Sequence, residues 1–166
     1  VDLSEYDVLI LPDGEGYEDF MDADRLKHLK EWVGNGGKLI AMGDALKGLS
    51  GENGFKIKAK EMKKDSTTNL QPHDDNERER IKSAITGAIF KAKVDTTHPL
   101  AFGYNDTYFS LKIGDNAYAY LKEGNVVYLE AESTKPVAGF AGSEARKKIG
   151  DTLIFGVEAH GDGQVI

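Results

Sequence analysis

The chain has 166 residues, of which 40% are apolar and 30% charged, and it contains no cysteine. This length predicts one domain, spanning 1–166, that needs neither a disulfide nor a structural metal for stability. The net charge of −7 disfavours nucleic acid and anionic membranes as partners, because binding to both depends on clustered Lys and Arg. No apolar run approaches the roughly 20 residues of a membrane-spanning helix, and the missing cysteine excludes a thiolate nucleophile.

The N-terminal region predicts a β-α-β unit. Residues 6–12 (YDVLILP) are nearly all apolar, which is typical of a parallel strand covered on both faces. Apolar residues spaced three and four apart predict an amphipathic helix over 22–33, with Asp22 as its N-cap and the glycines within 34–37 as its stop. Residues 38–42 then predict a second buried strand, and the crossover between the two strands is expected to be right-handed.

The middle of the chain is less regular. A turn at Gly43-Asp44 leads into a short predicted helix over 45–50. The lysine-rich stretch 55–64 (FKIKAKEMKK) predicts an exposed edge strand, because lysines that alternate with apolar residues protect a sheet edge; a nucleic-acid contact is the weaker alternative. Polar residues and a proline predict a loop over 65–76, and a helix is expected over 76–85.

The second half of the chain is rich in predicted strands. Short runs of aromatic and β-branched residues, separated by turns, predict strands at 88–94, 108–113, 117–121, 126–130 and 137–141. A capped helical turn is expected over 144–148. Residues 152–157 and 164–166 are predicted to pair as a hairpin through the turn at 160–163.

Both ends of the chain indicate a fragment. The first predicted buried strand begins within a few residues of the start, and the chain stops inside an apolar run at Val165-Ile166. A single β-α-β unit cannot cover both faces of a parallel sheet. We therefore expect the chain to belong to a larger polypeptide that supplies the rest of the sheet.

Several of these features together resemble a class I glutamine amidotransferase-like domain. They are the strand ending in Asp13-Gly14, the helix ending in 32–37 (WVGNGG), and the turn at Gly43-Asp44. The run 84–104 (AITGAIFKAKVDTTHPLAFGY) is similar to the C-terminal portion of bacterial zinc carboxypeptidases, and the closing 161–166 (GDGQVI) resembles non-catalytic domains attached to larger hydrolases. The resemblance implies an α/β, flavodoxin-like three-layer sandwich with a mixed, largely parallel sheet, present here as an incomplete copy.

The resemblance also places Asp44 where active amidotransferases have their cysteine nucleophile. Met42 and Leu46 stand where that family has small glycines, which is a further departure. A carboxylate is a far poorer acyl acceptor than a thiolate, so glutamine hydrolysis is not expected. The implied function is a non-catalytic accessory domain that packs against an intramolecular catalytic domain, with the parent protein a zinc carboxypeptidase whose zinc lies outside this chain. A secreted or periplasmic location follows from the resemblance alone.

Two roles stay open for Asp44. It is either an N-cap whose carboxylate accepts N–H groups of residue 46 or 47, or the base of a hydrolase that activates water with His160 or Glu15. Ligands of open α/β sheets bind at the carboxyl ends of the strands. The candidate crevice residues are therefore Asp13, Gly14, Glu15, Asp44 and Ala45.

The histidines do not predict a metal site in this chain. The H-E-x-x-H pattern does not occur, and His28 is expected at the surface of its helix. Glu158 and His160 share a strand face, yet their order is the reverse of the active family members, so His160 is expected to be a solvent-facing hairpin residue. His98 precedes Pro99 and is expected to stabilise its own loop.

A third class of function is self-association as a homo-oligomer through the incomplete sheet edge.

Overall fold

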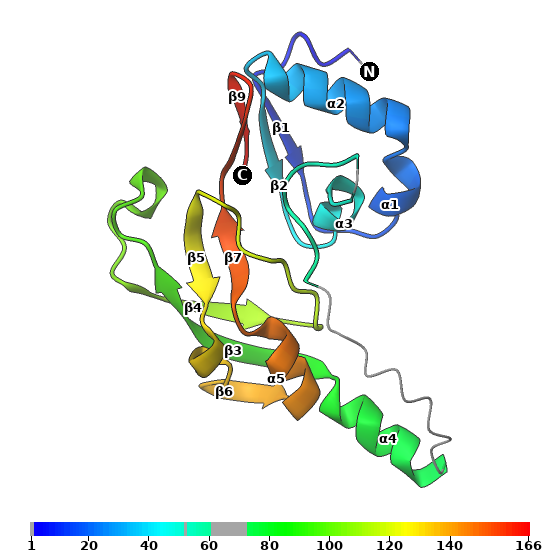
Figure 1. Cartoon of the computed structure of the whole chain (residues 1–166), viewed down its shortest axis with the longest axis vertical. Helices are drawn as coiled ribbons and strands as arrows, with labels where there is room; N and C mark the ends of the chain where they lie inside the picture. Colours follow the sequence, from blue (N-terminus) through cyan, green and yellow to red (C-terminus); the bar gives the residue numbers. More distant parts are fainter. Residues whose placement is uncertain (1, 52, 61–72) are drawn as a thin grey trace. The chain divides into compact units, whose positions relative to one another are not determined.

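The computed structural model describes residues 2–51, 53–60 and 73–166. The chain forms two compact units, each assembled from separate segments (Figure 1). Unit 1 comprises 1–59, 120–125 and 155–166, and unit 2 comprises 60–119 and 126–154. That 1–166 is a single domain stays a prediction. None of the described helices is long and apolar enough to span a bilayer.

Unit 1 is built around a four-stranded mixed sheet. Its order is β1-β2-β9-β8, where β1 is Val8–Leu11, β2 is Lys38–Ala41, β9 is Gly163–Val165 and β8 is Glu158–His160 (Figure 1). The first three of these strands are parallel, and β8 returns antiparallel to β9. The helices of this unit are α1 (Tyr17–Phe20), α2 (Ala23–Gly34) and α3 (Ala45–Leu49).

Helix α2 confirms the predicted amphipathic helix and its cap. Asp22 has extended backbone, and its carboxylate accepts the N–H of Arg25 at 2.8 Å. The helix buries Leu26, Leu29 and Val33 and contacts β8 and β9. The helix therefore covers one face of the sheet with the stripe that the sequence pattern predicts.

Strand β1 corrects one expectation. It pairs in parallel with β2, as predicted, but it is an edge strand of the sheet. Val8 is 45% exposed and Ile10 is 55% exposed, so the prediction of a strand covered on both faces is wrong. A run of apolar residues indicates that both faces of a strand are apolar. It does not indicate whether helices or another sheet cover both faces.

Unit 2 is built around a five-stranded sheet in which all pairings are antiparallel. Its order is β4-β3-β5-β7, and β6 also pairs with β3. The strands are β3 (Ile85–Val94), β4 (Thr107–Lys112), β5 (Asn125–Leu129), β6 (Ala138–Ala141) and β7 (Thr152–Gly156). The helices are α4 (His73–Lys82) and α5 (Ser143–Ile149), with 3-10 turns at Pro99–Ala101 and Ala131–Ser133.

The core of unit 2 follows from the alternation along β3. Ala88, Phe90, Ala92 and Val94 are buried, whereas the residues between them are partly or fully exposed. One core cluster joins these strands to α5, and its members are Ile85, Ala88, Phe90, Ala117, Leu129, Ala145 and Ile149.

The two sheets contradict the expected fold class. The prediction of a flavodoxin-like three-layer sandwich with a mixed, largely parallel sheet is wrong, because only β1, β2 and β9 are parallel and they form half of a two-sheet protein. Parallel strands need long crossovers, whereas the short strands of the second half are joined closely and pair antiparallel. The β-α-β start of the chain does not decide what the remaining residues form.

Several element boundaries also differ from expectation. Residues 117–121 form no strand and contribute one isolated bridge, between Tyr118 and Leu153. The C-terminal hairpin joins β8 to β9, and β7 belongs to the other sheet. Helix α4 begins at His73, before the expected start at residue 76. Of the predicted edge strand 55–64, residues 61–64 lie outside the described residues and 55–60 form no strand; of the predicted loop 65–76, residues 65–72 lie outside them.

Candidate functional site

The carboxyl ends of β1 and β2 bring Asp13 and Asp44 together. The two strands are parallel neighbours, and each aspartate follows its strand by two or three residues. The Asp44 N–H donates to Asp13 Oδ1 at 2.8 Å. This contact joins the two loops that the sequence predicted to line one crevice.

Gly43 makes this approach possible. Its φ is +56°, in the left-handed region, and a Cβ at this position would lie 2.1 Å from Asp13 Oδ1. The Asp13 carboxylate therefore fills the space beside the turn, and only glycine leaves room for it. The turn between β2 and α3 is a strand-to-helix corner, as the resemblance implied, but its corner is packed against a carboxylate.

Asp44 occupies the N-cap position of α3 without capping it. Its side chain accepts no hydrogen bond from the helix N–H groups, so the predicted bond to residue 46 or 47 is wrong. The carboxylate instead binds the Lys47 ammonium at 2.8 Å. That hydrogen bond raises the pKa of Lys47, and the charges of Asp44, Glu18 and Glu15 act in the same direction. The Lys47 ammonium, one helical turn further along, thus competes with the backbone N–H groups of α3 for the Asp44 carboxylate oxygens.

The other crevice candidates have mixed positions. Ala45 is fully buried and lines no open surface. Glu15 is exposed, and its negative charge helps to raise the pKa of Lys47. Gly14 lies against the Tyr17 ring, where a Cβ would be 3.7 Å from it. Among the residues that the structure describes, no group of three or more His, Asp or Glu side chains is placed to hold a metal ion.

His160 lies at the opposite end of the sheet from Asp44. It pairs with Gly163 in the β8–β9 hairpin, and Gln164 lies beside Lys38, the first residue of β2. Asp44 follows the other end of β2, and four residues of strand span roughly 13 Å. The structure therefore does not bring the imidazole to the Asp44 turn.

The imidazole has a structural contact instead. The His160 ring packs edge-on against Phe55, with ring centroids 5.4 Å apart, and the residue is only partly exposed, so the expectation of a solvent-facing residue holds in part. On the same strand, Glu158 is buried, and its Oε2 accepts the Lys56 N–H at 2.7 Å. Both side chains hold the segment around residue 55 against β8. The sequence showed only that Glu158 and His160 are two residues apart. Nothing in it indicated that residues 55 and 56 would be their partners.

His98 confirms its predicted role in the loop before β4. Its Nδ1 accepts the N–H of Leu100 at 3.2 Å, at the start of the 3-10 turn Pro99–Ala101. The imidazole thus replaces the side-chain cap that Asp or Ser usually supplies.

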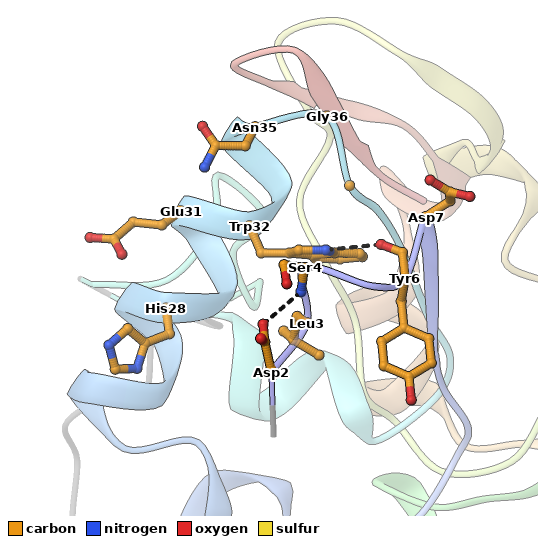
Figure 2. A pocket seen from close by; sticks show the side chains of 11 residues that line it. Asp2, Leu3, Ser4, Tyr6, Asp7, His28, Glu31, Trp32, Asn35 and Gly36 are labelled. Atoms are coloured by element: carbon orange, nitrogen blue, oxygen red, sulfur yellow. Dashed lines mark hydrogen bonds between the residues drawn. The ribbon is translucent and has the colours of Figure 1, made fainter.

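A pocket that the sequence did not indicate lies at the amino ends of β1 and β2. It has a volume of about 660 Å³, and the N-terminal segment and the end of α2 form its walls (Figure 2). Trp32 Nε1 donates to the Tyr6 carbonyl oxygen at 3.1 Å, and the indole lies against Gly37, where a Cβ would be 2.5 Å away. Asp2, Asp7 and Glu31 give the lining a negative charge, and His28 also lines it.

This pocket is at the end of the sheet opposite to the predicted crevice, since Asp7 precedes β1 and Gly37 precedes β2. The rule that places ligands at the carboxyl ends of strands pointed to the other end. The only sequence signal for the pocket is the single tryptophan followed by a glycine that its ring requires.

Fold and site together define an α/β protein with two sheets, in which the carboxylates after β1 and β2 bind groups of the chain itself. Comparisons with protein-family models, curated proteins and solved structures found no match. The resemblance to amidotransferase-like domains and zinc carboxypeptidases therefore stays a prediction from the sequence.

Proposed function

We propose that this chain is a non-catalytic accessory domain of a larger hydrolase, of the zinc carboxypeptidase class that the sequence resembles. In this proposal the zinc and the catalytic residues belong to another part of the polypeptide. The observation that carries the non-catalytic half of the proposal is the hydrogen bond from the Asp44 N–H to the Asp13 carboxylate.

Acyl transfer at a strand-to-helix corner depends on a backbone N–H that stabilises the developing oxyanion. At this corner the N–H of Asp44 already donates to the Asp13 carboxylate, so it does not offer itself to an oxyanion. The nucleophile also needs a base within hydrogen-bond reach. Asp44 pairs with the Lys47 ammonium, and His160 lies beyond the far end of β2. The bonds at this turn support a structural role.

An open apolar surface in unit 1 supports the accessory half of the proposal. Val8 and Ile10 project from the same face of β1, and Ile10 lies beside Ile40 of β2. Met42, which follows β2, is also exposed. Soluble proteins that act alone rarely expose contiguous apolar surface of this kind. A neighbouring catalytic domain that packs on this face would cover it.

The non-catalytic half is tested by incubating the purified chain with glutamine and measuring ammonia. We expect no release above buffer, with an active glutaminase as the positive control. Ammonia release that disappears in Asp44→Asn would contradict the proposal.

The accessory half is tested on the complete polypeptide that contains this chain. Its coding sequence is expected to include a zinc peptidase domain, and a reading frame without one contradicts the proposal. In that polypeptide, Val8→Lys with Ile10→Lys should lower the thermal stability of the peptidase, because two charges would enter an apolar contact. The matched control is Ile81→Lys, on an equally exposed apolar residue of α4. If both changes lower the stability equally, the face with Val8 and Ile10 is not the surface that contacts the peptidase.

A further inference from the structure

Strand β4 is an edge strand with little of the usual protection. It pairs with β3 over six consecutive residues without a bulge, from Thr107 beside Lys93 to Lys112 beside Ala88. It stands last in the strand order, and no described strand pairs with its other edge. Natural edges are usually blunted by proline, by bulges or by several lysines. The strand, TYFSLK, has one lysine and neither of the other devices.

The backbone groups of this edge point outward at alternate residues. The Val94 N–H donates to the Asp106 carbonyl oxygen at 2.9 Å, so the even-numbered residues direct their backbone groups to β3. Thr107, Phe109 and Leu111 then direct their N–H and C=O groups to the open edge. These groups form a template for one more antiparallel strand.

The side chains at the same edge are apolar. Phe109 is 59% exposed and Leu111 66%, and the two project from one face of β4. Ile113, which follows the strand, is 73% exposed. A strand that pairs here would extend the sheet and cover part of this row.

The two ends of the strand carry opposite charges. Asp106 precedes β4, and Lys112 is its last residue. The Lys112 ammonium donates to the Asn116 carbonyl oxygen and forms no ion pair with a carboxylate of the described residues, since Asp115 binds Lys148 at 2.8 Å. Burial lowers the pKa of Lys112, against the opposing charge of Asp115. This half-buried cation would gain from a carboxylate supplied from outside.

We propose that β4 pairs antiparallel with β4 of a second copy of the chain, about a two-fold axis at Phe109. In this register Phe109 lies opposite Phe109 of the second copy. Thr107 lies opposite Leu111 of the second copy, and Asp106 lies opposite its Lys112. Asp106 and Lys112 are equally far from Phe109 in the sequence, so a single register satisfies both charge pairs. A shift by two residues would keep the apolar row in contact but would separate the charges.

The pairing forms a closed dimer. A two-fold contact uses the same edge of both copies, so neither β4 edge remains for a third chain. The inference does not depend on the accessory role proposed above, because it uses only unit 2. A chain that dimerises can still lack a peptidase partner, and the two proposals can therefore fail separately.

The register is tested with single cysteines, which the absence of native cysteine makes clean. Phe109→Cys should form a disulfide-linked dimer on mild oxidation, because directly opposed residues of two strands meet the Cα separation of about 4.4–6.8 Å that a disulfide requires. Leu111→Cys is the matched control on the same edge. Its two copies would lie four residues apart along the strands, roughly 14 Å, and should not link. Equal linking of both variants, or linking of neither, overturns the proposal.

The charge pairs are tested by reversal. Asp106→Lys and Lys112→Asp should each sediment as a monomer of about 18.1 kDa at concentrations where the native chain sediments at twice that mass. Their equimolar mixture should dimerise again, because each lysine then faces an aspartate. Circular dichroism checks that both variants fold, and Leu111→Lys provides a second disruption that leaves Lys112 in place. A native chain that stays monomeric at all concentrations, or a mixture that does not associate, contradicts the proposal.

Discussion

At the scale of single residues, the Asp44 turn depends on the absence of one side chain. Gly43 adopts a left-handed φ while the Asp13 carboxylate lies against its Cα. Two separate energies are involved, the backbone strain of a substituted residue and the collision of its Cβ with Asp13. Gly16 offers a matched position, since its φ is +86° and a Cβ there would meet nothing within 4 Å.

The two energies can be separated by alanine substitution. Gly16→Ala should cost only the left-handed strain, ~1 kcal/mol of unfolding free energy. Gly43→Ala should cost ~2–3 kcal/mol, because the collision adds to the strain. Urea denaturation measures both. Adding Asp13→Ala to Gly43→Ala should recover part of the loss, and equal losses for the two single variants would show that Asp13 does not occupy the corner.

At the scale of elements, an ion pair connects α5 to the turn after β4. Lys148 near the end of α5 binds Asp115 at 2.8 Å, and its hydrogen bond holds the pKa of the Asp115 carboxyl below the usual value. A carboxyl with a lowered folded-state pKa stabilises the fold above its unfolded pKa, and this contribution is lost as the pH falls through the folded pKa.

Asp115→Asn is therefore expected to destabilise the protein at neutral pH and not in acid. The loss at pH 7 should stay below ~1 kcal/mol, because the pair is partly exposed. The difference from the native chain should close as the pH falls below about 4, near the unfolded pKa of an aspartate. Lys148→Met should behave in the same way. Urea midpoints measured against pH check this, and a difference that does not change with pH would contradict the assignment.

At the scale of the whole molecule, unit 1 depends on both ends of the chain. Strands β1 and β2 come from its beginning, whereas β9, which pairs with β2, comes from its end. The buried Leu39 of β2 lies beside the buried Val165 of β9. Unit 2 takes no strand from the residues after 156. The single tryptophan, Trp32, belongs to unit 1 and reports its state alone.

Removal of residues 158–166 should consequently unfold unit 1. The deletion takes away β8 and β9, which α2 contacts, and exposes the side chains of Leu26, Leu29 and Val33. Trp32 fluorescence should shift to the red value of the urea-unfolded chain, while circular dichroism retains signal from the antiparallel sheet of unit 2. Native Trp32 fluorescence in the truncated chain would be the opposite result.

Features that depend on neighbouring residues were predictable from the sequence. The N-cap Asp22, the buried stripe of α2 and the glycines that end it follow from helix geometry within a few residues. The alternation along β3 and the loop contact of His98 are local in the same sense. At the candidate site, the approach of Asp13 to Asp44 was predictable once two adjacent parallel strands were recognised.

Tertiary structure alone decided the rest, because the responsible contacts join residues that are distant in the sequence or compete with equally good local ones. Pairing of β9 with β2 placed His160 away from Asp44, and antiparallel pairing in the second half produced a second sheet. Lys47 displaced the expected cap at Asp44, since one carboxylate had two possible partners. The spacing of apolar residues indicates whether a segment is a helix or a strand. Which other segment it pairs with depends on the free energy of the whole packed chain.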